Sequence, residues 1–182
     1  MMVLRTDNDR GQASPQLMWH EIATAEQNPP VFDKLFELSW GVFAAYTPSD
    51  ELRSQQIESS DIWKQHIGLP GASIFYATNT ASTKPDEPLG FLFVVPRTQP
   101  LIGVELLHIK IAAVDEQSRG FGVFPFLLDR VKQLAARCGY REITVCTFPG
   151  RFQKMYRMLS SNGWKVVGWP VQNEKILMKL TV

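Results

Sequence analysis

The chain has 182 residues, of which 45% are hydrophobic, 11% aromatic and 20% charged. This composition excludes wholesale disorder, and the length fits one ordinary domain. The sequence has no uncharged apolar stretch of about 18 residues and only two cysteines, which argues against a membrane span and a disulfide framework.

Charged side chains are unevenly distributed along the chain, although the net charge is only +1. Residues 1–90 carry 6 Lys and Arg against 12 Asp and Glu, whereas residues 91–182 carry 13 against 6. We expect the basic second half to contact an anion. A phosphate-bearing cofactor suits it better than nucleic acid, because the sequence has no run of basic residues.

The first 16 residues are polar and predict a flexible arm, followed by one domain over residues 17–182. Because this arm has no apolar signal-peptide core, we expect a cytoplasmic protein. The three histidines are too scattered for a zinc site, so we expect no metal. A monomer and a homodimer are both compatible with the sequence.

Apolar periodicity and turn residues predict the secondary structure in chain order. In the first half we predict a strand over 17–25, helices over 31–46 and from about 49 to 67, and strands over 72–77 and 89–95. In the second half we predict a central strand over 104–114, a helix over 122–138, a strand over 141–148, a short helix ended by Gly163, and strands over 164–169 and 175–180. This order of elements indicates an α/β or α+β fold.

The loop QSRGFG, residues 117–122, lies between the predicted central strand and the long helix after it. Free backbone N–H groups and the helix dipole favour an anion at such a position. Gly120 and Gly122 would let the backbone approach phosphate groups closely. The spacing matches neither the dinucleotide-binding fingerprint nor a Walker A loop.

This segment resembles the GNAT superfamily of acyl-CoA-dependent N-acyltransferases, whose pattern Gln/Arg-x-x-Gly-x-Gly/Ala matches Gln117, Gly120 and Gly122. The likeness runs from the strand ELLHIKIAAV to Gly163-Trp164, which stands for the family's usual Gly-Phe. It implies a mixed, mostly antiparallel twisted sheet of about six to seven strands, flanked by about four helices. It also implies a V-shaped splay between strands 4 and 5.

The resemblance implies that acetyl-CoA, or another acyl-CoA, binds in this splay. The loop would hold the pyrophosphate on its backbone. The central strand would offer backbone groups to the pantetheine arm and an N–H to the thioester oxyanion. The residues expected to bind the cofactor are Ile109, Ile111, Ala112, Gln117, Ser118, Arg119, Gly120, Phe121, Gly122 and Val123. Arg119 would contact a phosphate, and the alternative is that it is an ordinary solvent-exposed charge with no role in binding.

Acetylation of an amine calls for a base, because an aliphatic ammonium is protonated at pH 7. His108 is the first candidate, since histidine titrates near the working pH and family members place bases on this face of the central strand. A structural histidine in the sheet is an equal alternative. Glu105 is the second candidate, although strand alternation puts it on the opposite face unless a β-bulge reverses the parity.

The family's usual general acid is a tyrosine, and its position here is Leu159. Tyr156, one turn earlier on the same apolar face, is the candidate replacement, and a packed core tyrosine is the alternative. Phe152 and Pro149 stand where many relatives have a cofactor-binding asparagine. We interpret Cys146 as a buried apolar cysteine rather than a nucleophile.

We expect the acceptor to be a small-molecule amine, contacted by the first two helices and the hairpin loop. Trp40, Tyr46 and Trp63 are candidate substrate contacts, although aromatic residues at helical spacing usually pack in a core. The acidic first half suits a cationic amine. Three functions stay open: direct acetyl transfer in a ternary complex, a non-catalytic acyl-CoA-binding module, and other thioester chemistry such as decarboxylation, hydrolysis or O-acylation.

Overall fold

The computed structural model describes residues 14–43, 52–84, 86–98, 105–167 and 175–182. Its elements are β1 (Leu17–Ile22), α1 (Pro29–Phe43), α2 (Leu52–Ile67), β2 (Ser73–Asn79), β3 (Gly90–Thr98), β4 (Glu105–Val114), α3 (Val123–Arg137), β5 (Glu142–Thr147), α4 (Gln153–Ser161), β6 (Lys165–Val166) and β7 (Ile176–Thr181). Short 3-10 turns at Ala25–Gln27 and Glu116–Ser118 were not predicted. The types and order of the other elements agree with the sequence-based prediction.

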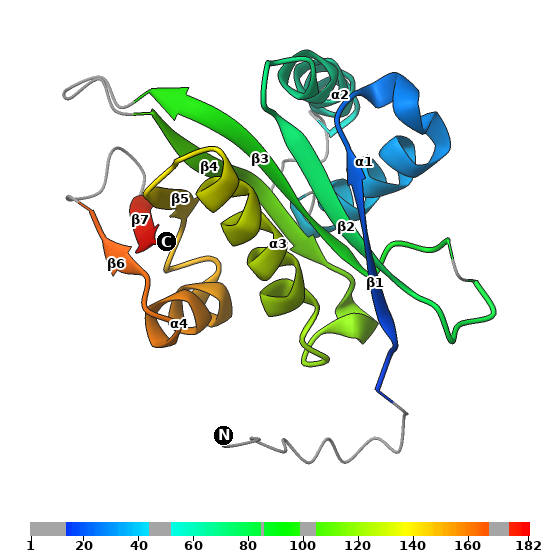
Figure 1. The fold of residues 1–182 in the computed structure, drawn as a ribbon. Coiled ribbons are helices and arrows are strands. Elements are labelled where there is room, and N and C mark those ends of the chain that lie inside the picture. The colour runs from blue at the N-terminus through cyan, green and yellow to red at the C-terminus, as the bar shows by residue number, and fades with distance from the viewer. Residues whose placement is uncertain (1–13, 44–51, 85, 99–104, 168–174) are drawn as a thin grey trace.

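The strands form one seven-stranded sheet in the order β1-β2-β3-β4-β5-β7-β6 (Figure 1). Only β4 and β5 run parallel, and every other neighbouring pair is antiparallel. The parallel pairing is short, joining Leu107–Ile109 to Ile143–Val145. Beyond Ile109 the two strands have no residue pairs, which confirms the splay predicted between the fourth and fifth strands.

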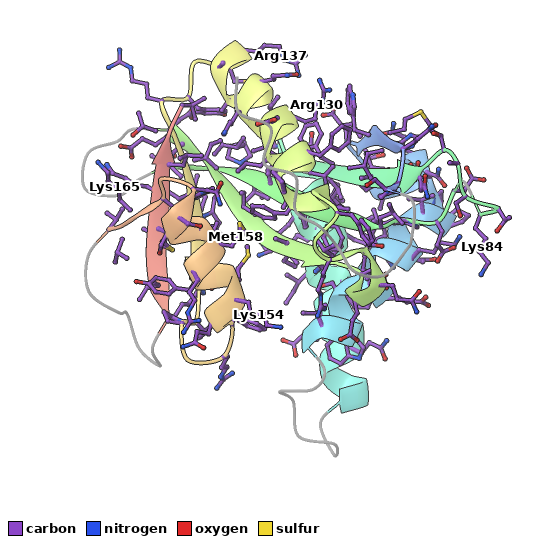
Figure 2. The ribbon with its side chains drawn as sticks, turned by 90° about the horizontal axis from the view of Figure 1, so that it is seen from below. Lys84, Arg130, Arg137, Lys154, Met158 and Lys165 are labelled. Carbon is purple, nitrogen blue, oxygen red and sulfur yellow. The ribbon has the colours of Figure 1, made fainter. Side chains whose placement is uncertain are left out.

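Helices cover both faces of the sheet (Figures 1 and 2). On one face, Leu127 of α3 and Leu159 of α4 belong to an apolar cluster with Leu107 and Ile109 of β4. On the other face, α1 and α2 bury a second cluster that includes Trp63. The predicted mixed α/β fold with about four helices is therefore confirmed. No helix within the described ranges is long and apolar enough to cross a membrane.

A β-bulge in β4 changes which side chains face each layer of helices. Phe93 of β3 pairs with Ile111, and the next residue, Val94, pairs with Ile109, so Lys110 is the extra residue. Leu107 and Ile109 therefore face α3, whereas His108 between them faces the α1 and α2 side. After the bulge the alternation shifts by one residue, because Ala112 packs toward α3 and Ala113 toward α1.

Candidate active site

A cavity of about 410 Å³ lies where β4 and β5 begin to separate, and we call it the β4–β5 cavity. Its volume falls within the range of roughly 300–1,000 Å³ that small-molecule sites occupy. It is bounded by the end of α2, the loop after it, the end of β3, the middle of β4, the end of β5 and the start of β7. Its lining residues are His66, Leu69, Val95, Pro96, Arg97, His108, Lys110, Cys146 and Lys175.

His108 lines this cavity, and only 6% of its surface is exposed. Its Nδ1 lies 2.9 Å from Oγ1 of Thr144, the residue opposite it on β5. This contact orients the ring and leaves Nε2 for a ligand. Burial, followed by the positive charges of Arg97, Lys175 and Lys110, lowers the pKa of His108 from 6.5 to about 3. The imidazole is therefore neutral at pH 7, the form that accepts a proton.

Three cationic side chains share the cavity with His108: Arg97 at the end of β3, Lys110 at the bulge and Lys175 just before β7. Lys110 is half-buried, and burial, followed by repulsion from Arg97 and Lys175, lowers its pKa. Within the described ranges, no Asp or Glu lines the cavity, and no ion pair includes any of these three residues. The cavity is therefore positively charged.

The acidic side chains of the first half that the structure describes do not line this cavity. Glu58 and Asp61 are exposed on α2 and lie outside the lining. Asp50 and Glu51 lie outside the described residues. The charge near the sheet's splay comes from the basic half of the chain instead.

The two candidate bases lie on opposite faces of β4. The bulge at Lys110 comes after both Glu105 and His108, so it does not bring them onto one face. Glu105 is exposed at the start of the strand. The pKa of Tyr140 is raised mainly by the burial of Tyr140 itself and next by the negative charge of Glu105. Of these two candidate bases, His108 is the one that lines the cavity.

Neither residue considered for the general-acid position lines the cavity. Leu159 is fully buried in the apolar cluster beneath α3, and Tyr156 is half-buried against the same cluster. The alternative reading of Tyr156 as a packing residue therefore agrees with its surroundings.

Cys146 is only partly buried and lines the cavity.

Two of the three aromatic residues predicted to contact the acceptor, Trp40 and Trp63, pack in the apolar cluster of α1 and α2. Trp63 is 3% exposed, and its ring meets those of Phe36 and Phe91 edge-on at centroid distances of 5.4 Å. Trp40 is half-buried and stacks on Phe36. Neither tryptophan lines the cavity, and Tyr46 lies outside the described residues.

Replacing Trp63 with alanine is expected to lower the free energy of unfolding by about 3–5 kcal/mol, because it empties a large site in a packed core. Urea denaturation followed by circular dichroism measures this change. Trp19 serves as a control, since 40% of its surface is exposed on β1 and its alanine variant should lose much less stability. Equal losses in the two variants would contradict the packing described for Trp63.

The loop before α3 already uses part of its predicted phosphate-binding backbone. The carboxylate of Asp115 accepts hydrogen bonds from the N–H of Gln117 and from the hydroxyl of Ser118. The N–H groups of Ser118 and Arg119 donate to the carbonyls of Asp115 and Glu116. Three of the N–H groups that the sequence analysis assigned to phosphate are therefore engaged in holding the turn.

The free donors lie further along, at the start of α3. The N–H groups of residues 120–124 make no backbone hydrogen bond within the part of the chain that the structure describes. Gly120 and Gly122 have φ of 87° and 80°, which favours glycine, and a Cβ at Gly122 would meet nothing within 4 Å. Open space, free donors and the helix dipole together fit the pyrophosphate of a CoA thioester.

The other residues predicted to bind the cofactor contribute in different ways. Ile109 and Val123 are buried in the cluster beneath α3, so only their backbone groups are available to a ligand. Ile111 and Ala112 lie beyond the last β4–β5 pair, with their backbone along the splay. Arg119 is exposed, and its Nε donates to the carbonyl of Val114. Phe121 is half-buried.

Sequence reasoning did not single out Arg97, Lys110, Thr144 or Lys175 as site residues. One available signal was that Lys110 follows His108 by two residues, and strand alternation places such residues on one face. The strand predicted over 89–95 ended before Arg97, but β3 extends to Thr98. Nothing in the sequence of the β7 region indicates that Lys175 reaches the cavity.

Several solved structures have the same architecture. The PaiA N-acetyltransferase from Thermoplasma acidophilum, in complex with coenzyme A, is 12% identical with a TM-score of 0.67, covering 92% of this chain and 99% of that chain. A GNAT-family acetyltransferase from Staphylococcus aureus Mu50 is 15% identical with a TM-score of 0.64, covering 91% and 98%. Aminoglycoside 6'-acetyltransferase type Ii is 20% identical with a TM-score of 0.62, covering 90% and 96%.

No family model and no curated protein matches the sequence. At these identities the structural likeness establishes the fold, which is the GNAT fold.

Proposed function

We propose that the protein is an N-acetyltransferase that moves an acetyl group from acetyl-CoA to a primary amine on a small molecule. The observation that carries this proposal is the position of His108. It is a buried, neutral imidazole, oriented by Thr144, at the edge of a cavity that begins where β4 and β5 separate. The coenzyme A bound to the T. acidophilum relative of similar fold supports the choice of acyl donor.

Acetyl-CoA supplies the acetyl group as an activated thioester. The N–H groups of residues 120–124 and the positive end of the α3 dipole bind its pyrophosphate. Beyond Ile109, β4 stays paired with β3 on one side, and its other edge, which β5 no longer covers, binds the pantetheine arm as a neighbouring strand would. A β4 N–H near the bulge stabilises the negative charge that develops on the thioester oxygen.

His108 holds the acceptor nitrogen and takes its proton. In the tautomer that donates from Nδ1 to Thr144, the lone pair of Nε2 accepts a hydrogen bond from the amine. The three cations of the cavity favour a neutral over a protonated amine at this position. When the nitrogen bonds to the acyl carbon its proton becomes acidic, so even a weak base such as His108 can accept it.

The sulfur leaves as a thiolate when the carbon–sulfur bond breaks. A thiol pKa of about 8.5 makes this an acceptable leaving group without a proton donor. The positive charges of Lys110, Arg97 and Lys175 favour the anion as it forms. This accounts for catalysis without a tyrosine at the position of Leu159.

The direct test is an acetyl-transfer assay with a panel of small amines, following thiol release and product mass together. We expect one thiol released for each acetylated amine. Thiol release without an acceptor would indicate hydrolysis instead. Acetyl-CoA binding with no turnover on any amine or O-acyl acceptor would indicate a binding module.

A further inference from the structure

The charge of the β4–β5 cavity restricts which amines it can accept. Arg97, Lys110 and Lys175 reach the cavity from three separate elements of the chain. They lie close enough that Arg97 and Lys175 both depress the pKa of Lys110. Mutual repulsion of this kind costs stability, and within the described ranges no carboxylate in the lining offsets it.

Lys110 is the most buried of the three cations that line the cavity. Its side chain is half-buried, and none of the ion pairs or side-chain hydrogen bonds among the described residues involves it. Half-burial removes part of the water around its ammonium group, and an opposite charge nearby would offset this cost. An anion in the cavity would supply that charge and would also attract the exposed Arg97 and Lys175, although Lys175 already lies over the Phe148 ring.

The phosphates of the acyl donor are poorly placed to be that anion. Lys110 lies four residues before Val114, where β4 ends, and the phosphate-binding donors come later still, at residues 120–124. At about 3.4 Å per residue, the strand alone separates Lys110 from Val114 by roughly 14 Å. The donor's pyrophosphate therefore has its own binding groups, and the cations of the cavity remain for another ligand.

We propose that the acceptor carries an anionic group, a carboxylate or a phosphate, near its amine, and that Arg97, Lys110 and Lys175 bind this group. The inference rests on the proposed function and names the substrate class for the same site. Small amino acids and amine-bearing phosphate esters have this chemistry. Polyamines and aminoglycosides, which carry several positive charges, would be repelled.

Matched pairs of acceptors test this proposal, each pair differing only in the anion. Amino acids are compared with their carboxamides, and phosphoethanolamine with ethanolamine, at saturating acetyl-CoA. We expect kcat/KM at least about 10-fold higher for the anionic member of a pair, because hydrogen bonds to a charged group are stronger than those to a neutral one. The amino-acid pairs test whether the enzyme requires a carboxylate, and the phosphoethanolamine pair tests whether it requires a phosphate.

Charge-removing variants identify the residues responsible. Lys175→Gln and Arg97→Gln should each raise KM for the anionic acceptor about 10-fold and leave KM for its uncharged partner unchanged. Lys165→Gln is the matched control, because Lys165 is exposed on the edge strand β6 (Figure 2) and is not one of the lining residues. Removing either cation also weakens the stabilisation of the leaving thiolate, so kcat should fall by the same factor for both members of a pair. An equal rise in KM for both members would contradict anion recognition.

A binding measurement keeps the inference testable even without turnover. The CoA-saturated protein is titrated with N-acetylated amino acids and N-acetylated phosphoethanolamine. The uncharged products, N-acetylated amino acid carboxamides and N-acetylethanolamine, are titrated for comparison. Tighter binding of the anionic products, lost in Lys175→Gln, supports the inference. Efficient acetylation of uncharged or polycationic amines would overturn it while leaving the acetyltransferase function intact. Absence of acetyl-CoA binding would overturn that function, and equal binding of charged and uncharged products would overturn the inference.

Discussion

Replacing His108 with glutamine is expected to lower kcat by about 10²–10⁴-fold, the usual contribution of a positioned base. Glutamine is polar and of similar length, so it keeps a hydrogen bond to Thr144 possible but accepts no proton. The Kd for acetyl-CoA should stay within about twofold of the wild-type value, because the loop and α3 are untouched. Steady-state kinetics and calorimetric titration measure the two quantities. Unchanged turnover in this variant would remove His108 from the mechanism.

A conservative change at Thr144 separates orientation from proton transfer. Thr144→Val removes the hydroxyl that lies 2.9 Å from Nδ1 and keeps the shape of a buried side chain. We expect kcat to fall about 10-fold while KM changes little, since the ring loses its orientation but not its basic nitrogen. Thr144→Ser should restore the rate. Failure of serine to do so would assign Thr144 a packing role alone.

The pH dependence of stability provides a check that requires no substrate. The pKa of His108 is about 3 in the folded protein and near 6.5 when unfolded, so the unfolded chain binds more protons between these values. Stability from this group is complete above pH 6.5 and declines as the pH falls toward 3. Going from pH 6.5 to 5 should cost about 2 kcal/mol. Over this pH range the His108→Gln variant should lose about 2 kcal/mol less of its free energy of unfolding than the wild-type protein, as measured by urea denaturation.

Substituting Gly122 with aspartate is expected to weaken acetyl-CoA binding about 100-fold or more. The new carboxylate would project into the open space at the start of α3, where we place the pyrophosphate, and like charges in contact cost several kcal/mol. The loss should appear as a raised Kd in calorimetric titration. The fold should survive, because a non-glycine residue at positive φ costs about 1–2 kcal/mol.

The same helix supplies a matched control at its other end. Gly139, just after α3, has φ of 76°, and a Cβ there also meets nothing within 4 Å. Gly139→Asp therefore introduces the same residue, the same backbone strain and an equally open position. It should destabilise the protein at least as much as Gly122→Asp and leave Kd for acetyl-CoA unchanged. Equal losses of affinity in both variants would show that the effect is structural.

The fold could be predicted because its determinants are local in the sequence. The apolar run ELLHIKIAAV marks β4, and the loop with Gly120 and Gly122 marks the start of α3. The predicted splay follows from the family resemblance and agrees with the short pairing of β4 and β5. Helix α1 begins two residues before its predicted start because prolines are accommodated in a first helical turn.

The composition of the site was harder to predict, because it depends on long-range contacts. Trp63 occurs at a helical spacing that suits both a core and a substrate wall, and only its ring contacts with β3 decide for the core. The charge of the cavity depends on Arg97 and Lys175, which are far apart in sequence and meet only through the strand order. Counting charges by halves of the chain identified the basic half but not which of its side chains line the cavity.

Isothermal titration of the purified protein with acetyl-CoA, and with CoA for comparison, tests the central claim most directly. We expect one site per chain with a micromolar or tighter Kd, about −8 kcal/mol. Gly122→Asp should weaken this binding about 100-fold or more, and Gly139→Asp should leave it unchanged. Failure of the wild-type protein to bind either compound would contradict an acyl-CoA-dependent function, leaving the GNAT fold as the only conclusion that stands.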